Sequence, residues 1–158
     1  MTLDDMLFSS ATQMAAAIRN KEVSSEELVK AHLERIAAVN PILNAVVQWD
    51  AEAAVRPARR CDELLAQGTL LGPLHGVPFT VKDAFETAGL AASAGTLGRR
   101  TFVPETDATA VARMRAAGAV LLGKTNVPEL SLVYECDNLV YGRTNHPHDL
   151  SRTPGGSC

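Results

Sequence analysis

The chain has 158 residues, of which 46% are hydrophobic and 21% are charged, and its formal net charge is −3 at pH 7. This composition is sufficient for one ordinary hydrophobic core, and the mild acidity argues against a nucleic-acid or membrane partner. No apolar run is long enough to span a bilayer, and residues 1–6 lack the basic start and apolar stretch of a signal peptide. We therefore expect a cytoplasmic protein.

Helical spacing dominates the chain before Gly68. A short amphipathic segment ends near Asn20, and residues 24–27, Ser-Ser-Glu-Glu, form a capping box that opens a second helix. Asn40-Pro41 should stop that helix, because proline lacks the amide hydrogen that a continuing helix needs. We expect these helices to cover one side of a sheet.

A third helix is predicted from Asp50 to Gly68. Pro57 falls inside this span, so the helix either kinks there or begins later than its composition suggests. No residue of these helices has a pattern that indicates chemistry.

After Gly68 the pattern changes to α/β. Leu74–Val81 is predicted to be a buried strand, and Thr106-Asp107 should cap a helix that closes at Gly118. Ala119–Leu122 is a short continuous apolar run, typical of a strand that is covered on both faces. The order strand, helix, strand predicts two parallel strands joined by a right-handed crossover.

The region from Asn126 to Cys158 is rich in turn residues and should form loops around an active site. His146 and His148 flank a proline here without a third ligand pattern, so we interpret them as loop residues rather than a metal site. Cys61, Cys136 and Cys158 are odd in number and widely spaced, which predicts free thiols rather than disulfides or a zinc site.

Lys82 and Ser157 are the candidate catalytic residues. Lys82 ends the strand-like run, and Ser157 follows Gly155-Gly156, two glycines that let backbone segments approach closely. Burial lowers the pKa of a lysine, and a neutral lysine can act as a general base through a neighbouring serine. Taken alone, Lys82 would be interpreted as a strand-end lysine that reaches solvent. No residue follows Cys158 in this sequence to be acylated.

Three ordered segments of the chain resemble the amidase signature family. They are GPLHGVPFTVKD at 72–83, GAVLLGKTNVPE at 118–129, and YGRTNHP at 141–147 with PGGS at 154–157. Together they are far more specific than any one of them. The resemblance implies an α/β fold in which N-terminal helices are followed by the start of a mixed β-sheet core covered by helices.

The resemblance also implies amide hydrolysis by a Ser-cisSer-Lys triad. Lys82 would be the base, Ser157 the bridging serine on a cis peptide bond, and the nucleophilic serine would lie further along the chain. Cys158 stands where the family more often has a second serine. The substrate would be a small-molecule amide, and no metal or organic cofactor is implied; the oligomeric state stays open.

On this interpretation the chain is the N-terminal part of a single amidase-signature domain. Residues 1–68 would be a helical lead-in, and residues 69–158 would start the catalytic core, with the rest of the domain absent. We therefore expect the 158-residue chain to be inactive by itself. A different class of function, a truncated and non-catalytic interaction protein, is the alternative.

A second alternative is a nucleotide-binding module, because Gly118–Thr125 fits the phosphate-loop pattern G-x-x-x-x-G-K-[ST]. In a phosphate loop the intervening residues are a flexible loop that follows a strand. Here they form the predicted strand themselves and follow a helix. We therefore interpret Lys124 and Thr125 as strand-end residues.

Three further residues receive structural interpretations. Asp83 directly follows Lys82, and strand neighbours point to opposite faces, so it should satisfy nearby backbone groups rather than pair with Lys82. His75 precedes the strand, and the family pattern gives it no catalytic role. Cys158 follows the Gly-Gly turn but is not expected to be the nucleophile.

Overall fold

The computed structural model describes residues 2–156, which form two compact units. Unit 1 contains the chain up to Ile36, Asp50–Phe79 and Ala112–Leu122. Unit 2 contains Ala37–Trp49, Thr80–Val111 and the described chain from Gly123.

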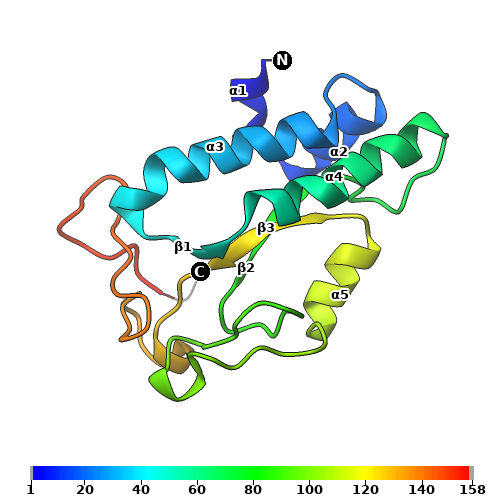
Figure 1. The fold of residues 1–158 in the computed structure, drawn as a ribbon. Coiled ribbons are helices and arrows are strands. Elements are labelled where there is room, and N and C mark those ends of the chain that lie inside the picture. Colours follow the sequence, from blue (N-terminus) through cyan, green and yellow to red (C-terminus); the bar gives the residue numbers. More distant parts are fainter. Residues whose placement is uncertain (1, 157–158) are drawn as a thin grey trace. The chain divides into compact units, whose positions relative to one another are not determined.

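The helices of the first 68 residues largely follow the sequence pattern (Figure 1). They are α1 (Leu3–Met6), α2 (Ala11–Arg19), α3 (Ser25–Leu43) and α4 (Ala51–Ala66). Helix α2 ends at Arg19 with Asn20 as its C-cap, which confirms the predicted end near Asn20. The capping box of α3 is also confirmed, because Ser24 N donates to Glu27 Oε2 at 2.9 Å and Glu27 N donates to Ser24 Oγ at 3.1 Å.

The prediction that Asn40-Pro41 stops the second helix is wrong, because α3 continues to Leu43. Pro41 cannot donate to the carbonyl four residues before it, but the turn that follows still closes, because Asn44 N donates to Asn40 O at 2.7 Å. The Asn40 side chain then supports the chain after the helix, since its Oδ1 accepts from Ala45 N and Val46 N, both at 2.8 Å.

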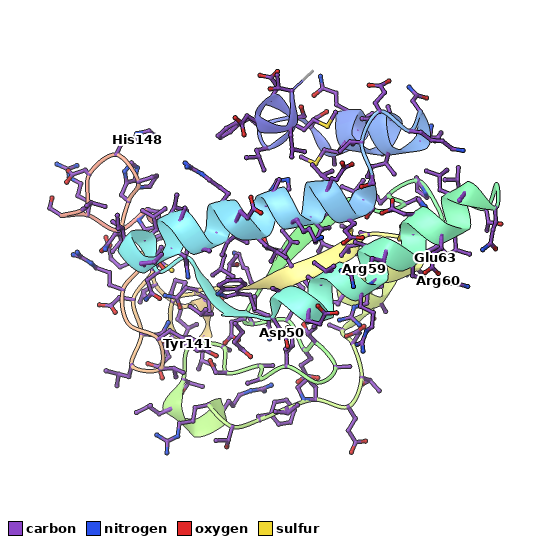
Figure 2. The ribbon with its side chains drawn as sticks, turned by 45° about the horizontal axis from the view of Figure 1, so that its top comes forward. Asp50, Arg59, Arg60, Glu63, Tyr141 and His148 are labelled. Carbon is purple, nitrogen blue, oxygen red and sulfur yellow. The ribbon has the colours of Figure 1, made fainter. Side chains whose placement is uncertain are left out.

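Helix α4 begins after Asp50, whose Oδ1 accepts from Ala53 N at 3.1 Å, and it continues through Pro57 to Ala66. Arg60 and Glu63 form an exposed ion pair of 3.1 Å on this helix, and Figure 2 labels both. Its apolar face packs in a cluster with α3 and the start of the sheet. The cluster contains Val29, Leu33, Ala54, Val55, Ala58, Cys61, Val120 and Leu122.

Three strands form one sheet in the order β1-β3-β2 (Figure 1). They are β1 (Val46–Trp49), β2 (Pro78–Lys82) and β3 (Val120–Thr125). Strand β1, which the sequence pattern did not reveal, pairs antiparallel with β3 and has an irregular register between Val46 and Gln48. Such irregularities bend a strand locally.

Strands β2 and β3 run in the same direction. The backbone bonds Val120 N to Val77 O (2.8 Å) and Asp83 N to Thr125 O (2.9 Å) advance together along both segments. Helix α5 (Thr109–Ala116) lies between them in the chain, so the predicted order of strand, helix and strand is confirmed. With one antiparallel and one parallel pair the sheet is mixed, and the α/β fold class is confirmed.

Two further element boundaries differ from the prediction. The strand expected over Leu74–Val81 begins only at Pro78, because Gly76 has a φ of 76° and residues 73–76 form a turn. Strand β2 is also less buried than expected, with Thr80 exposed. Helix α5 begins at Thr109, two residues after the predicted cap at Thr106-Asp107. The Asp107 Oδ1 accepts from Ala88 N at 2.8 Å.

Among the described residues, no helix has the length and apolar character needed to cross a membrane.

Candidate active site

Lys82 is the last residue of β2 and is half-buried. The chain turns directly after it, because Phe85 N donates to Lys82 O at 3.0 Å. The next amide, Asp83 N, donates to Thr125 O of β3 at 2.9 Å. Both hydrogen-bonding groups of the peptide between Lys82 and Asp83 are therefore fixed. All of these residues belong to unit 2.

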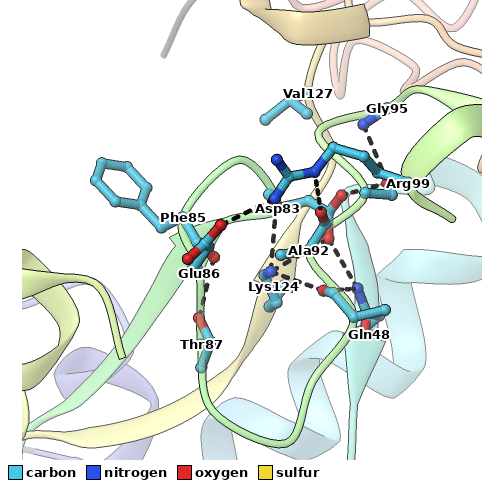
Figure 3. A network of polar contacts seen from close by, with 12 residues as sticks. Gln48, Asp83, Phe85, Glu86, Thr87, Ala92, Gly95, Arg99, Lys124 and Val127 are labelled. Carbon is cyan, nitrogen blue, oxygen red and sulfur yellow. Dashed lines mark hydrogen bonds and ion pairs between the residues drawn. The ribbon is translucent and has the colours of Figure 1, made fainter. Parts of the chain in front are cut away.

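The Asp83 carboxylate lies at the centre of a buried polar network (Figure 3). Its Oδ1 accepts from Gln48 Nε2 at 2.8 Å, and its Oδ2 accepts from Ser93 Oγ at 2.5 Å. Tyr141 OH lies 3.5 Å from Oδ1, and Lys124 Nζ lies 3.4 Å from the same oxygen. The prediction that this carboxylate satisfies backbone groups is wrong, because these four partners are side chains.

Lys124 is the cationic partner in this network, and its side chain is 0% exposed. Its Nζ donates to two backbone carbonyls, Ala91 O at 2.8 Å and Asp83 O at 3.1 Å. Burial lowers the pKa of Lys124, and the Asp83 carboxylate opposes this shift by favouring the charged form. Lys124 therefore joins β3 to the carboxylate and to the segment that contains Ala91.

Tyr141 and Gln48 complete the network. Gln48 Nε2 lies 2.8 Å from Tyr141 OH and donates to Ala91 O at 2.8 Å. Burial raises the pKa of the Tyr141 hydroxyl, hydrogen bonding with Ser93 and Gln48 opposes this shift, and the Asp83 carboxylate adds to it. The tyrosine is therefore a neutral hydrogen-bonding group near pH 7.

A second set of contacts fixes the segment that contains Ala91 and Ser93. Arg99 Nη2 lies 3.0 Å from Glu86 Oε1, and Arg99 Nε donates to Ala92 O at 3.2 Å (Figure 3). The guanidinium also lies 4.5 Å from the centre of the Phe102 ring, a distance typical of a cation–π contact. Arg99 therefore contacts the chain before Ser93, at Glu86 and Ala92, and after it, at Phe102.

Asparagine side chains fix the turn-rich region that follows β3. Asn138 Nδ2 donates to Asn126 Oδ1 at 2.7 Å, and Asn138 Oδ1 accepts from Tyr141 N at 2.8 Å. Asn44 Nδ2 donates to Tyr141 O at 2.8 Å. These bonds hold the backbone of Tyr141 from two directions. The prediction that this region consists mainly of loops is confirmed, and its place around an active site stays a prediction.

An open hollow of about 540 Å³ lies over residues 129–139 in unit 2. Leu130, Leu132, Val133 and Leu139 supply much of its lining, and each side chain is at least half exposed. The surface here is mainly apolar.

At Gly155-Gly156 the backbone approaches another backbone segment closely, as predicted. Gly155 has a φ of 87°, a conformation that favours glycine. A Cβ on Gly156 would lie 2.9 Å from Tyr134 O, so only a residue without a side chain fits there. Ser157 and Cys158 lie outside the described residues.

The glycines of the phosphate-loop lookalike have structural explanations. Gly123 lies within β3, where a Cβ would overlap Gln48 O of the paired strand. Gly118 has a φ of 91°, and a Cβ there would lie 2.8 Å from His75 Cα. The prediction that this segment is a strand is confirmed, and Lys124 is paired within the protein rather than presented to a ligand.

We expect nucleotides to leave the thermal stability of the protein unchanged. ATP or GTP with magnesium should not shift the melting temperature in differential scanning fluorimetry, whereas a ligand at 100 times its Kd would stabilise by about 2.7 kcal/mol. A nucleotide-dependent shift that Lys124→Met abolishes, and that the surface variant Lys30→Met retains, would contradict the interpretation of this segment as a strand.

His75 matches its structural interpretation. His75 is buried, its Nδ1 accepts from Leu71 N at 3.0 Å, and its Nε2 lies 3.0 Å from Cys61 O, so both ring nitrogens serve the fold of unit 1. Cys61 is a buried free thiol, and the buried Cys136 Sγ donates to Thr144 Oγ1 at 3.5 Å. Within residues 2–156, no group of three or more His, Cys, Asp or Glu residues could hold a metal ion.

Sequence reasoning missed the network around Asp83. Its members come from positions 48, 83, 93, 124 and 141, and no local pattern connects them. The sequence did contain one indication of this network, namely a charged residue near the end of each of two adjacent strands: Asp83 directly after β2 and Lys124 in β3.

The family model described as Amidase matches residues 27–158 of the chain. Among curated proteins, the chain is 44% identical over 155 residues to a component of the glutamyl-tRNA(Gln) amidotransferase of Acidothermus cellulolyticus, covering 98% of this chain and 31% of the relative. It is 40% identical over 157 residues to the acylamidase of Rhodococcus erythropolis, covering 99% and 33%. The chain thus spans about a third of the length of the curated relatives it matches.

Solved structures give the same result. The peptide amidase from Stenotrophomonas maltophilia matches with a TM-score of 0.84 and 37% identity, covering 95% of this chain and 32% of that chain. A bacterial aryl acylamidase of the amidase signature enzymes matches with a TM-score of 0.88 and 28% identity, covering 95% and 31%. The chain therefore belongs to the amidase family, the amidase signature enzymes.

Proposed function

We propose that this chain supplies the general base and the bridging serine of an amide-hydrolysing active site. The observation that carries the proposal is the position of Lys82, on a peptide fixed by Phe85 N and Thr125 O at the end of a strand. The match of the chain to amidases and amidotransferases supports the reaction class.

In the proposed mechanism, Lys82 acts in its neutral form. It takes a proton through Ser157 from a nucleophilic serine, which we place further along the chain of the complete enzyme. That serine attacks the amide carbonyl, the amine leaves with a proton, and water hydrolyses the acyl-enzyme. Lysine takes the part that histidine plays in other serine hydrolases.

The substrate is proposed to be a small-molecule amide. The hollow over residues 129–139, with its apolar lining, would suit an apolar substituent better than a charged one.

Replacing Ser157 tests its role as the bridging residue. In a complete enzyme that carries this chain, Ser157→Ala should lower kcat for an aryl amide by roughly 10⁴-fold, because triad members act as a unit. Hydrolysis is followed by release of the aryl amine. The matched control is the neighbouring Cys158→Ala, which should keep activity within a few fold.

Two results would contradict the assignment. Ser157→Ala with more than a tenth of the wild-type activity would remove Ser157 from the triad. An inactive but folded Cys158→Ala would instead indicate that the thiol is the nucleophile.

A further inference from the structure

The backbone on the C-terminal side of Lys82 is held at successive atoms. Lys82 O accepts from Phe85 N at 3.0 Å, Asp83 N donates to Thr125 O at 2.9 Å, and Asp83 O accepts from Lys124 Nζ at 3.1 Å. Few degrees of freedom remain for the strand end that carries Lys82.

The side chain of Asp83 adds a second anchor. It is 0% exposed, and its partners come from β1 (Gln48), from β3 (Lys124) and from the loop residue Ser93. Gln48 and Lys124 also share the carbonyl of Ala91 as an acceptor, each at 2.8 Å. The carboxylate therefore ties three separate segments of unit 2 to the residue next to Lys82.

We propose that Asp83 is a positioning residue for Lys82, and this inference rests on the proposed role of Lys82 as the base. The Asp83 carboxylate binds Gln48, Ser93 and Lys124, so Asp83 acts on Lys82 through the backbone that the two residues share. Active-site groups need placement within about 0.5 Å, and a misplacement of about 1 Å can cost about 100-fold in rate. Buried, multiply bonded anchors provide such precision.

A double-mutant cycle separates positioning from general stability. The four enzymes are the wild type, Asp83→Asn, Lys82→Ala and the double variant, each in a complete enzyme that carries this chain. Their kcat and KM are measured with an activated ester, so that residual turnover without the base stays measurable. Circular dichroism confirms folding at the assay temperature.

We expect Asp83→Asn to lower kcat by about 100-fold with little change in KM when Lys82 is present. In the Lys82→Ala background the same substitution should change kcat by less than about twofold, because residues that act through one another are not additive. If Asp83 had a purely structural role, Asp83→Asn would lower kcat by the same factor with and without Lys82.

Asp62→Asn is the matched control. The Asp62 carboxylate also accepts two short hydrogen bonds, from Ser25 N at 2.7 Å and Glu26 N at 2.9 Å. Asp62 belongs to unit 1, however, and it is not a sequence neighbour of Lys82. It should lower the melting temperature without changing kcat. If Asp83→Asn does not fold, Ser93→Ala takes its place in the cycle, since it deletes one bond to Asp83 without exposing a buried charge.

Three results would overturn the inference. The first is an equal fold-decrease in kcat for Asp83→Asn with and without Lys82. The second is an unchanged kcat in folded Asp83→Asn. The third, when Ser93→Ala is used instead, is an equal fold-decrease in kcat for that variant with and without Lys82. A Lys82→Ala enzyme that keeps its activity would overturn the proposed function as well, and this appears in the single variant, before any double variant is compared.

Discussion

Replacing Lys82 with alanine in a complete enzyme should lower kcat/KM for an amide substrate by about 10⁴ to 10⁶. The lysine removes a proton from the nucleophile through the bridging serine, and alanine has no basic group for this step. Lys82 is half-buried at the end of β2, so its loss leaves no large cavity and the fold should survive. Initial rates with an aryl amide measure the effect.

Lys30→Ala is the control for this prediction. Lys30 lies on the surface of α3 in an ion pair of 2.6 Å with Glu26, and its side chain is 49% exposed. Its replacement should leave kcat/KM unchanged within about twofold, since exposed ion pairs contribute little. A Lys82→Ala enzyme with more than a tenth of the wild-type activity would show that Lys82 is not the base.

Replacing Lys124 with methionine should destabilise the folded protein by about 3 to 5 kcal/mol. The substitution leaves the Asp83 carboxylate buried without its cation, and it removes the donor to Ala91 O and Asp83 O. The free energy of unfolding can be measured in urea through Trp49, the single tryptophan, which directly follows Gln48 of the network.

The double variant Asp83→Asn/Lys124→Met should recover much of this loss, because removing both charges of a buried pair avoids an uncompensated ion. Arg60→Met is the control on an exposed pair, where both side chains are 61% exposed, and should change stability by less than about 1 kcal/mol. A loss below about 1 kcal/mol for Lys124→Met would mean that the buried pair does not support the fold.

Local patterns predicted those parts of the fold that local interactions determine. The capping box at Ser24 and Glu27 and the apolar run of β3 each depend on residues that are close in the chain, and both are confirmed. The family was predicted from three ordered segments for the same reason, since each is a local string. Nothing in the structure tests the catalytic roles of Lys82 and Ser157, which stay predictions.

Long-range contacts decided the rest. Strand β1 is short, and it forms because Gln48 and Trp49 pair with β3, which lies more than 70 positions further along the chain. The partners of Asp83 are separated from it by up to 58 positions. Its place next to Lys82 in the sequence therefore predicted only that it does not pair with Lys82, and it did not indicate which residues it binds. Pro41 does not end α3, because the turn that follows it still closes through the bond from Asn44 N to Asn40 O.

Labelling with a fluorophosphonate probe and mapping the modified peptide is the most direct test of amide hydrolysis through a serine activated by Lys82. In a complete enzyme that carries this chain, we predict one labelled serine at a position beyond residue 158, and no labelling in Lys82→Ala. A label on any residue from 1 to 158, or full labelling in the absence of Lys82, would contradict the proposed triad.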